Sequence, residues 1–397
     1  MRPLSTTVRD LEQSQTLALT ALAHRLRQEG RDIVTLTAGE TDFPTPPVVK
    51  EAARKALRDN LTRYTANEGT AELLETIRHK FARENGIQLE CDQILVSSGA
   101  KQSIFNALMA LCSPGDEVVI ISPYWVSYPE MVKLVQAVPV VVRTSMTDRF
   151  LPRPESIREA ITRRTKALIL NSPGNPSGMV SSGEACEEIA AIVRETGIFV
   201  VTDEIYEQVV YEGHRHFSIG SLQGVADQVI TVNGVSKAYA MTGWRIGFMG
   251  GPREVVEAAA KVQSQTTSNA NSIAQFAAVT ALRECRDDVV RMVSELQLRR
   301  DLVYRSLKEI PEVDVLLPEG AIYAFFNVEA MLGRESGGRP VRTSSDIARY
   351  LLEEHRVALV PGSAFGQEGF LRLSFGGARD QLESGLARIS EGLGNLR

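Results

Sequence analysis

This 397-residue sequence is poor in the residues that build disulfide-rich or metal-binding proteins. The few cysteines are Cys91, Cys112, Cys186 and Cys285. They are widely spaced and include no C-x-x-C pair, so we expect reduced thiols in a cytoplasmic protein. Only His214 and His216 form a close histidine pair, and without a third ligand nearby we expect no metal site.

The sequence also lacks an excess of positive charge and any long apolar run. The formal net charge is −5 and basic residues form no runs, which argues against a nucleic-acid partner. No apolar stretch approaches the ~18 residues that a membrane helix needs, so we expect no membrane span. Asp10 and Glu12 argue against a secretory signal, and Ser14 is the expected cap of a helix that stops at Gly30.

A repeated strand–turn–helix pattern fills the middle of the chain. The expected strands cover residues 94–97, 117–121, 138–142, 166–170, 198–202 and 229–232. Strands that alternate with helices predict a largely parallel sheet with right-handed crossovers, which is an α/β fold. Beyond residue 252 helices dominate, and they predict a smaller α+β domain with strands at 320–327, 357–360 and 371–375 and a loop at 333–339.

A lysine follows one of these strands in a setting that suggests chemistry. Ser236 and Lys237 come just after the strand at 229–232, and Arg245 lies eight positions beyond the lysine. A desolvated lysine amine has a lowered pKa and attacks carbonyls, while a hydroxyl and a guanidinium suit a phosphate dianion. This set of groups is what pyridoxal 5′-phosphate (PLP) requires. The ordinary alternative is a solvated surface lysine.

Other strand ends carry polar residues as well. Asn175 follows the strand at 166–170 in a turn rich in proline and glycine, and Asp203 and Tyr206 follow the strand at 198–202. Open α/β sheets bind ligands at the carboxyl ends of their strands, although Asp203 could also serve as a helix N-cap.

The remaining candidates are weaker when taken singly. Gly99, Ala100 and Lys101 open a helix, where backbone N–H groups form a ready anion site. Trp125 could stack on a planar ring or simply pack in the core. A further glycine, Gly39, sits in a proline-rich turn of the kind that lets backbone approach a ligand.

Taken together, these residues resemble the fold type I PLP enzymes, specifically the class I aminotransferases. The specific runs are Asn175-Pro-Ser-Gly178, Asp203-Glu-Ile-Tyr206 and Ser236-Lys-Ala-Tyr-Ala-Met-Thr-Gly-Trp-Arg245. Pro123-Tyr-Trp-Val-Ser-Tyr-Pro-Glu130 is similar to the bacterial aspartate aminotransferase subgroup. The resemblance implies a large domain with a mostly parallel seven-stranded sheet plus a smaller α+β domain. We expect an N-terminal arm at 1–45, the large PLP-binding domain at 46–285 and the small domain at 286–397.

The resemblance also implies a role for each catalytic candidate. Lys237 would carry PLP covalently and then move a proton at the substrate Cα. Asp203 would face the ring nitrogen and keep it protonated. Tyr206 and Asn175 would hydrogen-bond the phenolic oxygen of the ring, and Trp125 would stack on the ring.

Binding roles follow from the same resemblance. The phosphate would lie among Ser236, Arg245 and the backbone of residues 99–101. Arg372 would grip the substrate α-carboxylate, with Gly39 close by. Tyr64 would reach the phosphate of the neighbouring subunit, so a homodimer with shared active sites is expected.

The expected reaction moves an amino group between aspartate or glutamate and a 2-oxo acid by a ping-pong mechanism. The region from 265 to 272 lacks the arginine that some aspartate aminotransferases use for the distal carboxylate, and Lys101 is expected to replace it. Ala100 stands where the bacterial subgroup commonly has glycine. Aromatic, kynurenine or alanine aminotransferases and a PLP lyase remain open.

Two other classes are disfavoured. An NAD-dependent dehydrogenase would show G-x-G-x-x-G after an early strand, and the sequence has none. A PLP-fold transcription regulator would carry a basic DNA-binding domain, and too few residues precede Gly39 for one.

Overall fold

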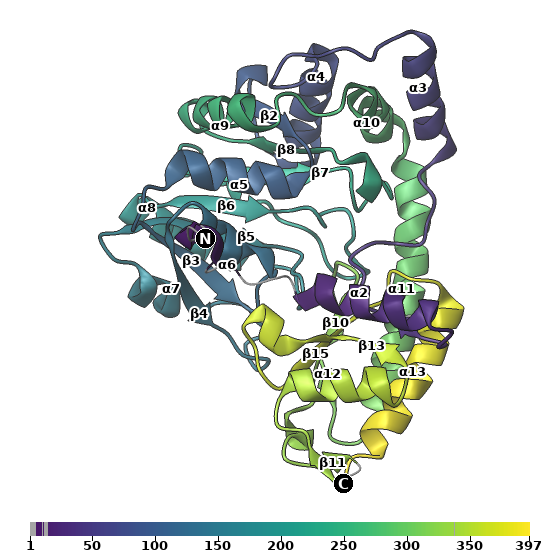
Figure 1. Cartoon of the computed structure of the whole chain (residues 1–397). Helices are drawn as coiled ribbons and strands as arrows, with labels where there is room; N and C mark the ends of the chain where they lie inside the picture. Colours follow the sequence, from purple (N-terminus) through teal and green to yellow (C-terminus); the bar gives the residue numbers. More distant parts are fainter. Residues whose placement is uncertain (1–4, 10, 12–14, 337) are drawn as a thin grey trace.

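The computed structural model describes residues 5–9, 11, 15–336 and 338–397, so Asp10, Glu12 and Ser14 lie outside the described residues. A seven-stranded sheet and a four-stranded sheet form the two main layers of strands. Figure 1 shows helix α11 (Arg286–Lys308) running along one side of the molecule past both regions. The expected α/β class with a seven-stranded sheet is confirmed.

The large sheet has the strand order β2-β8-β7-β6-β5-β3-β4, and only β8 runs antiparallel to its neighbours. Its strands are β2 (Ile94–Ser97), β3 (Glu117–Ser122), β4 (Val138–Arg143), β5 (Thr165–Asn171), β6 (Phe199–Asp203), β7 (Val229–Gly234) and β8 (Gly247–Gly250). Because β8 is reversed, its amino end lies at the same edge as the carboxyl ends of the others.

Helices bury both faces of this sheet, which explains its near-continuous apolar strands. Along β3, Val118 and Ile120 join one core cluster, whereas Val119 joins the cluster on the opposite face. The surrounding helices are α3 (Pro47–Arg58), α4 (Ala71–Lys80), α5 (Ala100–Leu111), α6 (Ser127–Leu134), α7 (Pro154–Ala160), α8 (Gly183–Thr196), α9 (Arg253–Thr266) and α10 (Ser272–Glu284).

The smaller sheet has the order β14-β15-β10-β9 and packs against α11 and the C-terminal helices. Its strands and helices are β9 (Asp314–Val315), β10 (Tyr323–Asn327), β14 (Val360–Pro361), β15 (Phe370–Ser374), α12 (Ser344–Glu353) and α13 (Arg379–Gly394). Near the start of the chain lie α1 (Thr6–Arg9), α2 (Gln15–Gln28) and β1 (Val34–Thr35). Strand β1 pairs in parallel with β13 (Val357–Ala358), so the N-terminal segment joins this region.

Two expectations about this region were wrong in detail. The loop expected at 333–339 contains a short hairpin of β11 (Glu335–Ser336) and β12 (Arg339–Pro340), with Gly338 at a φ of 79° in its turn. The strand expected at 357–360 is split, because β13 pairs with β1 while β14 pairs with β15. Helix α13 was not predicted from the sequence.

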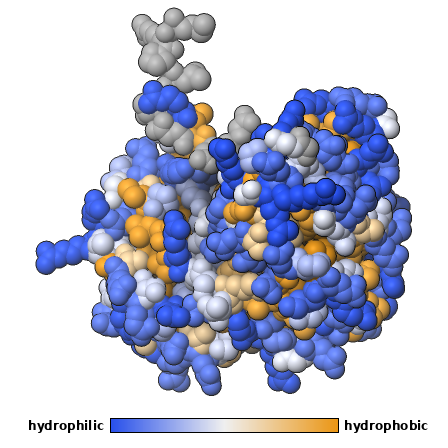
Figure 2. Space-filling model, turned by 90° about the horizontal axis from the view of Figure 1, so that it is seen from below, coloured by the Kyte–Doolittle hydropathy of each residue, from blue (hydrophilic) through white to orange (hydrophobic). Residues whose placement is uncertain are grey.

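Short turns of tighter or wider helix complete the chain. They are Phe81–Asn85 (a π-turn), Cys91–Gln93, Ile219–Ser221, Thr242–Trp244, Glu329–Met331 and Gly362–Phe365. Across the described part of the chain, every helix is too short or too polar to serve as a membrane span. The face in Figure 2 is mainly hydrophilic, with hydrophobic side chains in scattered patches.

Candidate active site

Most of the predicted site residues line one cavity of about 300 Å³ at the carboxyl edge of the large sheet. These residues are Gly39, Ala100, Lys101, Trp125, Asn175, Asp203, Tyr206, Ser236, Lys237, Arg245 and Arg372. They come together because parallel strands end at one edge, where the connecting loops meet. Arg245 arrives differently, since it directly precedes the reversed strand β8.

Lys237 is partly buried in this cavity and lies in the turn after β7, three residues beyond the end of the strand. Its Nζ donates a hydrogen bond to the carbonyl oxygen of Gly39 at 2.5 Å and lies 5.8 Å from the centre of the Tyr206 ring. Burial lowers the pKa of Lys237 to about 8, although the Glu40 carboxylate opposes the shift. A larger fraction of this amine is therefore neutral and nucleophilic near neutral pH than of an exposed lysine.

Asp203 is the last residue of β6, lines the cavity and is 4% exposed. Its Oδ2 accepts a hydrogen bond from the Tyr128 hydroxyl at 2.7 Å, and its Oδ1 accepts one from the Ile205 N–H at 3.2 Å. Burial raises the pKa of Asp203 to about 6, even though both hydrogen bonds act in the other direction. A cation placed in the cavity would lower this pKa again by pairing with the carboxylate.

Two tyrosines meet beside the lysine. The hydroxyls of Tyr206 and Tyr323 are 2.7 Å apart, and burial raises the pKa of both. A Cβ on Gly39 would come within 2.7 Å of the Tyr323 oxygen, so a larger residue here would displace the Tyr323 hydroxyl. The close approach places the Gly39 carbonyl where it accepts the lysine hydrogen bond.

Arg372 projects from β15 and is 2% exposed. Its guanidinium donates to Asn175 Oδ1 at 2.9 Å and to the Thr37 carbonyl at 2.7 Å. The rings of Tyr323 and Phe365 flank it at 4.4 and 4.8 Å. Among the described residues its Nε has no hydrogen-bond partner, and the groups that affect its pKa besides burial are the Tyr323 and Tyr206 hydroxyls. A buried guanidinium with an unused donor suits an anionic ligand.

The start of α5 forms a second anion site. Gly99 has a φ of 92°, and Ala100 begins the helix, so the first N–H groups point out of its end. Strand β8 passes close behind, because a Cβ on Gly247 would lie 2.1 Å from the Ala100 nitrogen. The Arg245 guanidinium packs over Gly99 and donates to the Ser98 carbonyl at 3.3 Å. Helix N–H groups, a guanidinium and a nearby serine match a phosphate.

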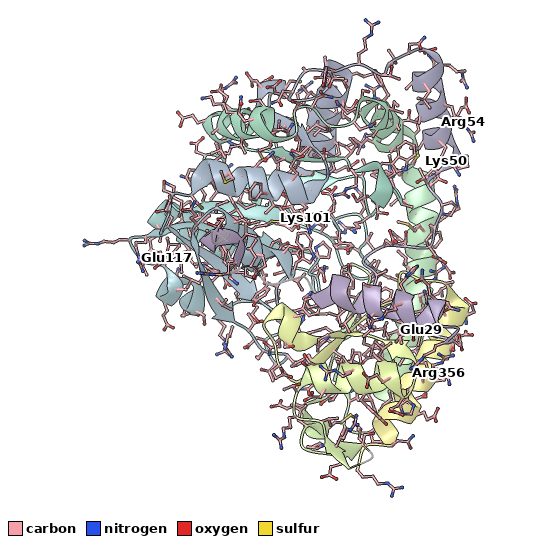
Figure 3. All side chains as sticks on the ribbon, in the orientation of Figure 1. Glu29, Lys50, Arg54, Lys101, Glu117 and Arg356 are labelled. Carbon is pink, nitrogen blue, oxygen red and sulfur yellow. The ribbon has the colours of Figure 1, made fainter. Side chains whose placement is uncertain are left out.

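Lys101 lies next to this site, near the centre of the molecule in Figure 3. Although the residue is exposed, its Nζ is 4.7 Å from the centre of the Trp125 ring, which meets Tyr128 edge to face. Partial burial of the ammonium, and then the positive charge of Arg245, lower the pKa of Lys101. The Lys101 ammonium thus lies beside Trp125, and both residues line the cavity.

Two predicted residues, Tyr64 and Gly99, do not line this cavity. Tyr64 is 89% exposed in the loop after α3, and it faces solvent in the single chain. Gly99 does not line the cavity either, but it supports Arg245 and the start of α5. The structure therefore groups all the predicted residues except Tyr64.

Sequence reasoning missed Tyr128, Tyr323 and Asn171, which also line the cavity. Tyr128 lies in the first turn of α6, and its N–H donates to the carbonyl of Trp125, which precedes the helix, at 3.0 Å. The amide of Asn171 donates to the Asp203 carbonyl at 2.9 Å and so joins two strand ends. Nothing in the local sequence marked Tyr323, which reaches the site by pairing of β10 with β15.

The family model for aminotransferases of class I and II matches residues 31–389. An aspartate/prephenate aminotransferase of Nitrosomonas europaea is 44% identical over 391 residues, which are 98% of both chains. The crystal structure of the aspartate aminotransferase from Rhizobium meliloti is 41% identical and covers all of both chains, with a TM-score of 0.97. That of Thermus thermophilus with maleate is 43% identical, with a TM-score of 0.92 over 98% of this chain and 100% of that one.

The chain belongs to the class I and II aminotransferase family, and it has the fold of the fold type I enzymes. It is a transaminase of the PLP-dependent kind, and the family implies PLP as its cofactor. The expectations of family, fold and enzyme class made from the sequence are confirmed.

Proposed function

We propose that this enzyme transfers an amino group between aspartate or glutamate and a 2-oxo acid, with PLP held by Lys237, in a ping-pong reaction. One observation carries the proposal. A lysine with a depressed pKa, a buried carboxylate and a buried arginine with an unused donor line the same cavity. A nucleophilic amine, an anion for a ring nitrogen and a cation for a carboxylate are what amino transfer requires.

The residues of the cavity fit PLP. The Asp203 carboxylate has no cationic hydrogen-bond partner among the described residues, so a protonated ring nitrogen can pair with it. Tyr206 and Asn175 supply polar groups for the phenolic oxygen, and Trp125 supplies an aromatic face. The phosphate would lie at the start of α5, with Ser236 and Arg245. When bound, PLP supplies an electrophilic carbonyl and a ring that accepts electrons from the substrate Cα.

The other steps belong to residues of this chain. Arg372 would bind the substrate α-carboxylate and orient the Cα–H bond toward Lys237. Once displaced by the substrate amine, Lys237 would take the proton from Cα and return it, and its lowered pKa favours the neutral form for this role. This role is supported by the hydrogen bond from Lys237 to the Gly39 carbonyl, because Arg372 donates to the carbonyl of Thr37 two residues away.

Acidic substrates are supported by Lys101 and by the relatives. Its ammonium lies over Trp125, where a distal carboxylate would approach. The related Thermus thermophilus enzyme was solved with maleate, a dicarboxylate. Curated relatives from Rhizobium meliloti and Pinus pinaster carry the name aspartate aminotransferase. A substrate bound in the cavity would cover the Lys101 ammonium, and a neutral substrate would leave that ammonium unpaired.

A second acceptor, prephenate, is favoured by one observation. The Nitrosomonas europaea relative is named for prephenate as well as aspartate. In this chain a larger cavity of about 720 Å³ adjoins the site and shares Lys101, Val126, Ser127 and Arg245 with it. That space would hold an acid bulkier than oxaloacetate.

A homodimer with shared active sites completes the proposal. Tyr64 is 89% exposed, and Leu57 and Leu61 nearby are 52% and 39% exposed. Exposed large apolar side chains within one short stretch of the chain favour a protein contact. Tyr64 would then enter the cavity of the partner subunit and reach its phosphate site.

The proposed function is tested by incubating the PLP-loaded enzyme with single amino acids and 2-oxoglutarate, oxaloacetate or prephenate. We expect aspartate and glutamate to be the best donors. Equal or better turnover of aromatic amino acids, kynurenine or alanine would contradict the proposed specificity. Ammonia release or decarboxylation in place of amino transfer would contradict the reaction itself.

A further inference from the structure

A buried ionic cluster lies directly behind the candidate active site and has no role in the reaction proposed above. We call it the Glu204 cluster, and it consists of Lys80, Asn85, Glu204, Glu207 and His216. These residues come from α4, the π-turn after it, the turn after β6 and the following loop. The side chain of His216 is 9% exposed and that of Glu204 1% exposed, so the charges are cut off from water.

Glu204 is the centre of this cluster. Its carboxylate accepts hydrogen bonds from His216 Nε2 at 2.9 Å, Ser218 Oγ at 2.8 Å, Asn85 Nδ2 at 3.1 Å and Thr202 Oγ1 at 3.2 Å. These donors satisfy both oxygens and fix the side chain from several directions. A buried carboxylate held in this way tolerates little rotation.

The second carboxylate, that of Glu207, forms an ion pair with Lys80. Asn85 joins the two halves, because its Nδ2 donates to Glu207 at 2.6 Å while its Oδ1 accepts from Lys80 Nζ at 2.6 Å. Glu204, Glu207 and His216 have ligand atoms within 4.8 Å of one another, as a metal site would. Lys80 already supplies a cation to this set, so we assign no metal to it.

Lys80 pairs with Glu207 and also lies 3.8 Å from the Glu84 carboxylate outside the cluster, so the charge of Glu204 is compensated when His216 is protonated. Burial opposes the charge on His216, but Glu204 and Glu207 outweigh burial and the repulsion from Lys80 and raise the pKa of His216. Removing either the Glu204 carboxylate or the His216 charge would leave an uncompensated buried charge.

The backbone connects this cluster to the active site within one turn. Glu204 directly follows Asp203, and its N–H donates to the Val232 carbonyl at 2.9 Å. The next N–H, that of Ile205, donates to Asp203 Oδ1 at 3.2 Å. The Glu207 N–H donates to the Glu204 carbonyl at 2.9 Å, which closes the turn around Tyr206. Any shift of Glu204 therefore moves a donor of Asp203 and the Tyr206 side chain.

We propose that Glu204 is a positioning residue, which acts through this turn to fix the Asp203 carboxylate and the Tyr206 hydroxyl. The proposal rests on the proposed function, in which these two groups hold PLP. Replacing Glu204 with the neutral glutamine turns an NH₂ group toward groups that donate to the carboxylate, and it leaves protonated His216 without its ion-pair partner. The turn then relaxes, and both active-site groups lose their alignment.

The experiment compares Glu204→Gln with Glu117→Gln in the full-length protein. Glu117 is a matched control, because it is 4% exposed, accepts a hydrogen bond from Thr162 and pairs with Arg164. It begins β3 at the opposite edge of the sheet, far from Lys101 in Figure 3. Two readouts are measured. The first is the dissociation constant of PLP from the enzyme, and the second is the pH at which the visible absorption of the holoenzyme is halfway through its change in a pH titration.

We expect Glu204→Gln to weaken PLP binding about 10-fold, which is a common effect of losing a residue that orients the direct ligands of a bound group. Glu117→Gln should change neither readout. The pH midpoint of the visible absorption should rise in Glu204→Gln. A misaligned Tyr206 would no longer stabilise the deprotonated form of the group that links Lys237 to PLP, so a higher pH would be needed to remove its proton. If Glu204→Gln does not fold, His216→Gln removes the opposite charge and should raise the same midpoint.

Each outcome bears on a different claim. The positioning role alone would be overturned if folded Glu204→Gln or His216→Gln kept the wild-type PLP affinity and absorption midpoint. Equal changes in Glu117→Gln would overturn it as well. A wild-type protein that binds no PLP would overturn the proposed function, and this inference with it. Asp203→Asn serves as the reference, since direct loss of the carboxylate should change both readouts.

Discussion

The hydroxyl of Tyr128 donates a hydrogen bond to Asp203 Oδ2 across 2.7 Å, from α6 to the end of β6. The oxygen is shielded from water on this side, since Tyr128 is 2% exposed. The hydrogen bond stabilises the charged carboxylate against the cost of burial, which raises the pKa of Asp203. Tyr128 thus keeps Asp203 ready for a cationic partner.

Replacing Tyr128 with phenylalanine tests this relationship. A hydrogen bond to a charged group contributes ~1.5–3 kcal/mol, so Tyr128→Phe should weaken PLP binding by about 10- to 100-fold. The measurement is a PLP titration of the apoenzyme followed by absorbance. Tyr350→Phe is the control, because its hydroxyl donates to the Gly392 carbonyl at 3.0 Å, outside the cavity. Unchanged affinity in Tyr128→Phe would contradict the account of Asp203.

The stability of the apoenzyme should depend on pH through Asp203. Its pKa rises from 3.8 to about 6 on folding, so the folded state binds more protons between these values and loses stability as pH increases through that window. Asp203→Asn removes this loss and should be more stable than the wild type above pH 6, by roughly 3 kcal/mol at most. Urea unfolding at a pH below 4 and at a pH above 7 measures the difference. If Asp203→Asn changed the free energy of unfolding equally at the two pH values, burial would not destabilise the charged carboxylate.

Specificity for acidic substrates should depend on Lys101. Bound aspartate would cover the Lys101 ammonium, and losing one partner of a charge pair buried in this way costs ~2–5 kcal/mol. Lys101→Ser should therefore lower kcat/KM for aspartate by roughly 30- to several-thousand-fold, and far more than for alanine. Steady-state kinetics with both donors measure this ratio. Lys308→Ser, at an exposed lysine near Asp314, is the control and should leave the ratio unchanged. An equal fall for both donors would favour the aromatic or kynurenine alternatives.

The shared active site predicts complementation between two inactive variants. Lys237→Ala and Tyr64→Phe damage different halves of each site, so a mixed dimer retains one intact site. Refolding equal amounts together should restore about a quarter of wild-type activity, because half of the dimers are mixed and half of their sites are intact. No recovery, or a fully active monomer by sedimentation, would contradict the dimer.

The sequence was sufficient for most of the site because a parallel sheet brings its strand ends together. Asp203 and Lys237 each follow a buried apolar run, and that position alone places them at the binding edge. Arg245 reaches the same edge from the amino end of the reversed strand β8, and its direction could not be seen in the local pattern.

Contacts between distant segments could not be predicted in the same way. Tyr323 reaches Tyr206 through the pairing of β10 with β15, and Tyr128 reaches Asp203 through the packing of α6. The Glu204 cluster likewise joins residues more than a hundred positions apart. The domain boundaries at residues 46 and 286 stay a prediction, as do the individual roles of the site residues.

The central claim is that Lys237 carries the cofactor, and borohydride tests it most directly. Reduction of the holoenzyme fixes PLP to its lysine, and mass mapping of the digested protein locates the pyridoxyl group. The geometry of the cavity predicts the modified peptide that contains Ser236 and Lys237. A pyridoxyl group on Lys101 or any other lysine, or none on a protein that has turned over substrate, would contradict the account.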